Sequence, residues 1–216
     1  MKEIFENTIK EFDDVNAHDP HLEMIEGEKI PKELLYSKRM TEMLNHYRPD
    51  ASETLQLAAR CQHIKRWAIP REEYPMDKKG YLLWRTTLKK YHGELATSIM
   101  IRNGYGQEEI QKVDDLLNKR RLKSDEETQT LEDVICLVFL KYYFDEFITK
   151  HDEAKLVEIV QKTWNKMSEN GRKAALQLDH SETALAIVKK ALNYISHIIR
   201  NGLRGKIIDK IKIISF

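Results

Sequence analysis

Hydrophobic residues recur every three or four positions along most of this chain, which is the spacing of amphipathic helices. Ile4, Phe5, Ile9 and Phe12, for example, share one face of the first predicted helix. The pattern predicts helices over about 2–12, 32–46, 50–64, 80–103, 107–122, 131–147, 153–167 and 181–200. The stretch from Val134 to Leu140 is apolar nearly all round, so we expect its helix to be the central one.

The segments between the helices predict no paired strands at any point of the chain. Residues 67–79 contain two prolines and follow no period, so they predict a loop of about a dozen residues, a length at which a functional role is common. The Ile-rich segment 206–216 fits a helix end, a short strand or a partner-binding tail. We therefore predict an all-α fold, a compact multi-helix bundle forming a single domain over 1–200, followed by a tail over 201–216.

The composition changes this picture little, but it excludes several classes of protein. The 216 residues include 36 basic and 35 acidic side chains, so no excess of positive charge favours duplex nucleic acid. The longest apolar run is far shorter than the roughly 20 residues of a membrane span, and the charged start of the chain predicts no signal peptide. Cys61 and Cys136 lie in apolar helical patterns and predict reduced core thiols. We expect a cytoplasmic protein that spans no membrane.

The segment from Arg60 to Arg71 holds the most unusual combination of side chains. It places His63 on a helix face of small apolar residues, with Arg66 and Trp67 one turn further on. Two interpretations of His63 fit the sequence: a metal ligand or proton donor beside an anion, or a core histidine that bonds a backbone carbonyl. In the first interpretation, the arginines and the indole form the wall of an anion-binding pocket.

Three further residues could complete a site around His63. His92 lies on the inward face of the helix predicted over 80–103, and Glu132 and Asp133 lie in the first turn of the helix predicted over 131–147. Acidic residues are common in first turns, because the helix dipole favours them there. Metal sites in helical bundles take inward ligands from several helices, and imidazoles with a carboxylate suit Mn, Fe, Co, Ni or Zn. The predicted metal ligands are therefore His63, His92 and Asp133, and the candidate catalytic residues are His63, Glu132 and Asp133.

A second group of cations ends the helix predicted over 107–122. Arg120 and Lys123 fit a solvated helix terminus, because cations favour the C-terminal end of a helix. They also fit half of a phosphate clamp, because arginine binds phosphate through two parallel hydrogen bonds. The clamp interpretation assigns the binding of a small anionic or phosphorylated ligand to Arg66, Trp67, Arg71, Arg120 and Lys123.

Five strings of the sequence are long enough to be specific to a family: 12–20, 31–36, 57–64, 74–77 and 122–125. Together they resemble an uncharacterised family, the domain-of-unknown-function 4202 family. The similarity runs from about Ile9 to about Leu185. The resemblance implies a shared fold and names no activity.

A more distant resemblance is to the HD-domain phosphohydrolases, which are helical bundles that hold metal ions through histidine and aspartate. In residues 58–64, Gln62 stands where these hydrolases have the histidine of their His-Asp pair, and His63 stands where they have the aspartate. Residues 91–96 resemble the additional histidine helix of the branch that cleaves cyclic dinucleotides. Asp133 matches the late aspartate. The resemblance implies an HD-like fold.

The departures from the HD pattern leave several functions open. The His-Asp pair is absent, and Arg120 and Arg121 replace a later pair of histidines. A reduced one-metal site and a metal-free phosphate-binding pocket both fit this pattern. The leading expectation is metal-assisted hydrolysis of a small phosphorylated metabolite or nucleotide. The alternatives are a non-catalytic, degenerate HD-like domain that binds an anionic small molecule as a sensor or interaction module, and a helical scaffold without a ligand.

Overall fold

The computed structural model describes residues 2–122 and 124–200, with side chains described as far as residue 193. Helices dominate this part of the chain, which contains ten α-helices and one two-stranded sheet, so the prediction of an all-α fold is confirmed. Lys123 and the segment 201–216 lie outside the described residues. No helix of the described part is both long enough and apolar enough to cross a membrane. Cys61 and Cys136 are buried, as predicted.

Contacts within the chain divide it into two compact units, and the boundary falls between Val134 and Ile135. The expectation of a single domain over 1–200 stays a prediction. All predicted site residues that the structure describes belong to the first unit, so the fold of that unit positions the site.

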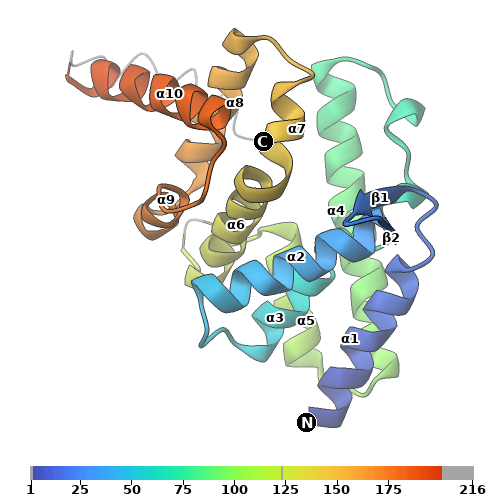
Figure 1. Ribbon diagram of the computed structural model, residues 1–216. Coiled ribbons are helices and arrows are strands. Elements are labelled where there is room, and N and C mark those ends of the chain that lie inside the picture. Colours follow the sequence, from blue (N-terminus) through green and yellow to red (C-terminus); the bar gives the residue numbers. More distant parts are fainter. Residues whose placement is uncertain (1, 123, 201–216) are drawn as a thin grey trace. The chain divides into compact units, whose positions relative to one another are not determined.

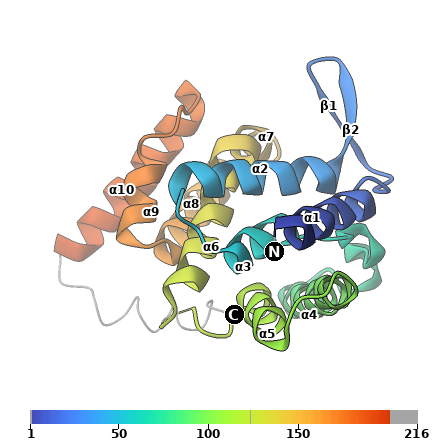
Figure 2. The ribbon, with the colours of Figure 1, turned by 90° about the horizontal axis from the view of Figure 1, so that it is seen from below.

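The first unit contains five α-helices and the beginning of a sixth (Figure 1). They are α1 (Lys2–Asn16), α2 (Lys32–Tyr47), α3 (Glu53–Arg60), α4 (Lys78–Arg102), α5 (Gln107–Asn118) and the first part of α6 (Glu126–Val138). α4 and α5 lie side by side, and α3 packs against both α2 and α5 (Figure 2). Large side chains from these helices are fully buried between them, among them Phe12, Met40, Leu57, Ile99 and Leu116. The apolar stripes of the sequence therefore meet in one core.

A β-hairpin joins α1 to α2, so the prediction that no strands pair is wrong. The strands are β1 (Leu22–Ile25) and β2 (Glu28–Pro31), and they pair antiparallel. Glu26 and Gly27 form the turn with φ angles of 51° and 88°, the positive values that two-residue hairpin turns require. Leu22 and Met24 are more than half exposed, so the strands lack the alternation of buried apolar and exposed polar residues that identifies a strand in a sequence.

The segment between α3 and α4 is the predicted loop, and it is fixed to α4 at two places. It contains two short 3₁₀ helices, Arg66–Ala68 and Arg71–Glu73. The indole nitrogen of Trp84 donates a hydrogen bond to the carbonyl of Ile69 at 2.9 Å. A Cβ atom on Gly80 would lie 2.1 Å from the carbonyl oxygen of Pro75, so only glycine allows this approach of the loop to α4.

In the second unit, the end of α6 is followed by a π-helical turn and four helices. These elements are the π turn Phe139–Tyr143, α7 (Phe144–Ile148), α8 (Glu153–Lys166), α9 (Glu169–Ala175) and α10 (Glu182–Arg200). α10 packs against α8 and α7. The helix predicted over 131–147 is thus interrupted by the π turn. α9 was not predicted, because its seven residues are too few to show a period.

Candidate functional site

Glu33 lies in the first turn of α2, where its backbone is bonded by the buried carboxylate of another residue, Asp19. Asp19 accepts a hydrogen bond from the backbone N–H of Glu33 at 2.9 Å. The side chain of Glu33 is only 8% exposed, and its carboxylate lies 3.5 Å from Nδ1 of His63 and 4.0 Å from Nε of Arg66. Burial raises the pKa of Glu33 to about 7, although the charge of Arg66 opposes the rise.

His63 follows α3 and packs between two aromatic rings. Its ring is stacked on Tyr36 of α2, with a centroid distance of 4.1 Å, and lies 6.0 Å from the ring of His92. Burial lowers the pKa of His63 well below its usual value, and the positive charges of Arg66 and Arg85 lower it further. His63 is therefore a neutral imidazole at neutral pH, although it lies 3.5 Å from a carboxylate.

His92 is buried on α4 and bonds the turn that carries His63. Its Nδ1 atom lies 2.8 Å from the carbonyl oxygen of Ile64. Because a carbonyl can only accept, Nδ1 carries the proton and Nε2 has the free lone pair. Burial and the adjacent His63 lower the pKa of His92 to about 3. The interpretation of a core histidine bonded to a backbone carbonyl thus applies to His92 rather than to His63.

Three cations from two neighbouring helices lie beside these histidines. Arg85, Lys89 and His92 are four and three residues apart, which places them on one face of α4. Lys119 ends α5, which packs along α4, and its ammonium group pairs with the buried carboxylate of Glu132. Burial lowers the pKa of Lys89, and the charges of Lys119 and Arg85 lower it further. We call Arg66, Arg85, Lys89 and Lys119 the cationic cluster.

The cationic cluster carries more positive charge than the adjacent carboxylates neutralise. Glu33 lies beside Arg66, and Glu132 pairs with Lys119. In the described part of the chain, no carboxylate lies within 4.0 Å of the charged groups of Arg85 or Lys89, and the guanidinium of Arg85 donates to the hydroxyl of Tyr81 instead. Within the described residues, four cations therefore lie beside two carboxylates, which is an excess of two positive charges.

The structure brings together four of the predicted site residues. His63 lies near both His92 and Arg66, and the negative charge of Glu132 acts on Arg85 and Lys89. The guanidinium of Arg66 also lies 4.7 Å above the ring of Trp84, a cation–π contact that fixes its plane.

The other predicted binding residues have different surroundings. Arg71 donates to the carbonyls of Tyr74 and Pro75 at 3.0 and 2.7 Å, so its guanidinium holds the loop between α3 and α4. Trp67 is half-buried in the first 3₁₀ helix. Arg120 is exposed and pairs with Asp114 and Asp115, each at 2.6 Å. Lys123 lies outside the described residues.

Asp133 is buried and is bonded by two polar side chains. Its carboxylate accepts hydrogen bonds from the hydroxyl of Tyr47 and from the amide of Gln129, both at 3.0 Å. The predicted metal set requires Asp133 to lie with His63 and His92. Within residues 2–122 and 124–193, no three side chains of His, Cys, Asp or Glu lie close enough together to hold a metal ion.

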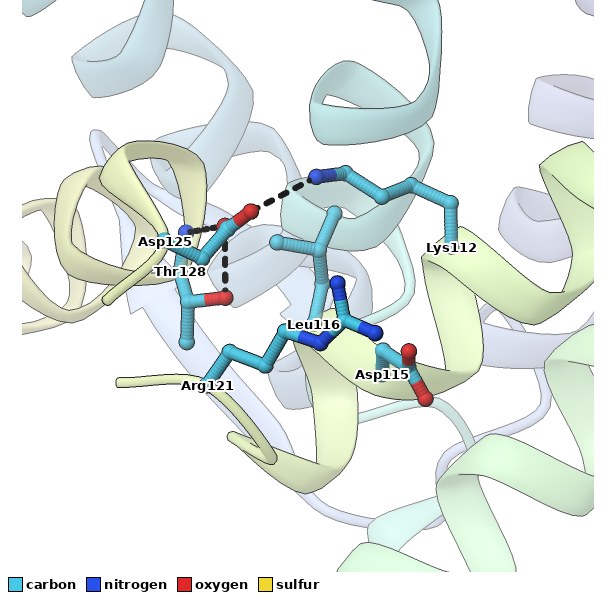
Figure 3. Close-up of a pocket in the computed structure, with 6 residues that line it drawn as sticks. All are labelled: Lys112, Asp115, Leu116, Arg121, Asp125 and Thr128. Atoms are coloured by element: carbon cyan, nitrogen blue, oxygen red, sulfur yellow. Dashed lines mark hydrogen bonds and ion pairs between the residues drawn. The ribbon is translucent and has the colours of Figure 1, made fainter. Parts of the chain in front are cut away.

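The small cavity in Figure 3 is a separate feature at the start of α6. It has a volume of about 20 Å³, which is room for about one water molecule. Asp125 dominates it, accepting from Lys112 at 2.9 Å and from the backbone N–H of Thr128 at 2.7 Å. None of the predicted site residues lines this cavity, and Asp125 bonds both Lys112 and Thr128 there (Figure 3). We assign it a structural role in holding α6.

Sequence reasoning missed Glu33, Arg85, Lys89 and Lys119. The spacing of Arg85, Lys89 and His92 on one helix face was a usable signal, because the helix over 80–103 was itself predicted. Glu33 gave no such signal, because an acidic residue in a first turn is typical of any helix.

Residues 6–188 match the sequence model of one family, which is described as "Domain of unknown function (DUF4202)". The chain belongs to this family. No curated protein and no solved structure matches the chain. Every residue of the cationic cluster of this DUF4202 protein, and both histidines beside it, lie within the matched range.

Proposed function

We propose that this DUF4202 protein binds a small phosphorylated metabolite or nucleotide through the cationic cluster. The observation that carries the proposal is the pair Arg85 and Lys89, because no carboxylate of the described residues lies within 4.0 Å of either charged group and the charges of Lys119 and Arg85 lower the pKa of Lys89. A partly buried charge without a partner is unfavourable, so these residues favour a bound anion. A phosphate monoester carries a charge of about −1.5 to −2 at pH 7, which matches the unneutralised charge of the cluster.

The arginines and the lysines of the cluster would bind the phosphate in different ways. The two arginines offer planar guanidinium groups that bind phosphate oxygens in pairs, and the contact with Trp84 holds the plane of Arg66. Lys89 and Lys119 act as point charges. His63, whose side chain is 24% exposed, contributes a neutral ring at the edge of the cluster.

Calorimetric titration with inorganic phosphate at low ionic strength tests this proposal. Arg85→Gln removes a charge-assisted hydrogen-bond donor, so we expect phosphate affinity to fall about 10-fold to 100-fold. Arg120→Gln is the matched control, because Arg120 pairs with Asp114 and Asp115 outside the cluster, and it should leave the affinity unchanged. Absence of phosphate binding at millimolar concentration, or an equal loss in both variants, would contradict the proposal.

Metal-assisted hydrolysis of such a ligand by an HD-like domain stays a prediction. It requires a divalent ion held by the imidazoles and a carboxylate. His63 and His92, whose rings lie 6.0 Å apart, are the described imidazoles that would take part, and such an ion would activate water. Metal analysis and a phosphatase screen of the wild type, His63→Ala and His92→Ala test it. Metal whose occupancy disappears in both variants would favour the hydrolase, whereas phosphate binding without metal or turnover would favour the sensor or interaction module.

A further inference from the structure

The ring of Tyr81 lies at one end of the cationic cluster and is ordered by its neighbours. Its hydroxyl accepts a hydrogen bond from the guanidinium of Arg85 at 3.2 Å. The indole of Trp84 lies 5.9 Å from it, centroid to centroid, and the guanidinium of Arg71 lies 5.9 Å from its centroid. Despite these contacts, 42% of Tyr81 is exposed. Tyr81 therefore has an ordered, partly exposed aromatic side chain beside the cations.

The order of side chains along α4 places this aromatic surface in line with the positive charges. Tyr81, Arg85 and Lys89 follow one another at intervals of four residues, so they share one face of the helix. With a rise of 1.5 Å per residue, the two cations lie about 6 and about 12 Å along the helix from Tyr81. A ligand that fits this row has a planar ring at one end and phosphate at the other.

We propose that Tyr81 stacks on the base of a nucleotide whose phosphate occupies the cationic cluster. This inference rests on the proposed phosphate site and narrows its ligand to a nucleotide. A sugar phosphate of the same charge contacts only the cations and leaves the ring of Tyr81 unused. Stacking of a base on an aromatic side chain strengthens binding by about 10-fold to 100-fold and tolerates any base, because every base has a π-face.

Calorimetric titration with ribose 5-phosphate and with the four ribonucleoside 5′-monophosphates tests the inference on the full-length chain. These ligands share the phosphate and the ribose, so the ratio of their affinities isolates the base. For the wild type, we expect at least one nucleotide to bind about tenfold or more tightly than ribose 5-phosphate. Tyr81→Phe and Tyr81→Leu both remove the hydroxyl that accepts from Arg85, so they differ only in the ring. Tyr81→Phe, which keeps the ring, should preserve the ratio, and Tyr81→Leu should bring it close to one.

The outcomes separate this inference from the proposal on which it rests. If ribose 5-phosphate and all four nucleotides bind equally tightly, the phosphate site stands and the stacking role of Tyr81 is wrong. The same conclusion follows if Tyr81→Leu keeps the full nucleotide preference. If none of the five compounds binds, the phosphate site and the inference both fail. Melting curves followed by circular dichroism show whether each variant is folded, and the exposure of Tyr81 favours a folded Tyr81→Leu.

Discussion

The Nδ1 atom of His92 lies 2.8 Å from the carbonyl oxygen of Ile64, and this bond joins the middle of α4 to the turn after α3. The turn carries His63 and leads directly into Arg66, whereas α4 carries Arg85 and Lys89. This buried hydrogen bond therefore helps to set the position of Arg66 relative to Arg85 and Lys89.

His92→Leu is expected to destabilise the protein by about 1–3 kcal/mol, because it leaves the buried carbonyl of Ile64 without a donor. Urea denaturation followed by circular dichroism measures the change in the free energy of unfolding. His46→Leu serves as the control, since His46 is exposed, and it should change the free energy by less than about 0.5 kcal/mol. Equal effects of the two substitutions would show that the bond has no structural role.

Glu33→Gln is expected to change how stability depends on pH. The pKa of Glu33 is raised to about 7 in the folded protein, above its ordinary value of 4.5, so its contribution is fully present below pH 4.5 and is lost as the pH rises through 7. The free energy of unfolding of the wild type should therefore fall, relative to Glu33→Gln, by ~3 kcal/mol between pH 4.5 and pH 8. Denaturation curves at several pH values measure the difference, and parallel curves for the two proteins would contradict the raised pKa.

Anion binding is expected to weaken as the pH rises through about 7. Ionisation of Glu33 adds a negative charge next to Arg66 and thereby opposes an anion in the cluster. Sulfate is the suitable probe, because it stays a dianion throughout this range. Titrations at pH 6 and pH 8 should show weaker sulfate binding at pH 8 in the wild type and equal binding in Glu33→Gln. A wild-type affinity that is the same at both pH values would exclude this role of Glu33.

Lys89→Gln is expected to weaken phosphate binding about tenfold while leaving the unliganded protein as stable as the wild type or more stable. The reason is that Lys89 is crowded by the like charges of Lys119 and Arg85 and has no carboxylate partner in the described part of the chain. Lys90→Gln is the control, since Lys90 is exposed and its ammonium group lies 3.6 Å from the carboxylate of Glu94. Calorimetry and thermal melting give the two quantities, and a loss of stability without a loss of affinity would assign Lys89 a structural role.

The helical architecture was accessible from the sequence because it follows from periodic burial. The period of apolar residues, for example, gave α4 within two residues at its start and one at its end. The hairpin was missed because Glu26, rather than asparagine or glycine, takes the first position of the turn with positive φ.

The site was only partly accessible from the sequence, because it depends on distances between helices. The sequence indicated that His63 and His92 face inward, and the structure puts their rings 6.0 Å apart. The sequence could not indicate which carboxylate lies next to His63. In the structure it is the carboxylate of Glu33 on α2, and the sequence had suggested Asp133. Arg120 was grouped with the site on charge alone, although its guanidinium is paired with Asp114 and Asp115.

The most direct test of the phosphate site is a two-dimensional ¹H–¹⁵N NMR titration of the full-length protein with inorganic phosphate. We expect the largest shifts at the side-chain N–H groups of Arg66 and Arg85 and at the backbone amides around His63, Lys89 and Lys119. The exposed N–H groups of Arg120 should shift least. Shifts centred on Arg120, or a spectrum unchanged at millimolar phosphate, would contradict the account.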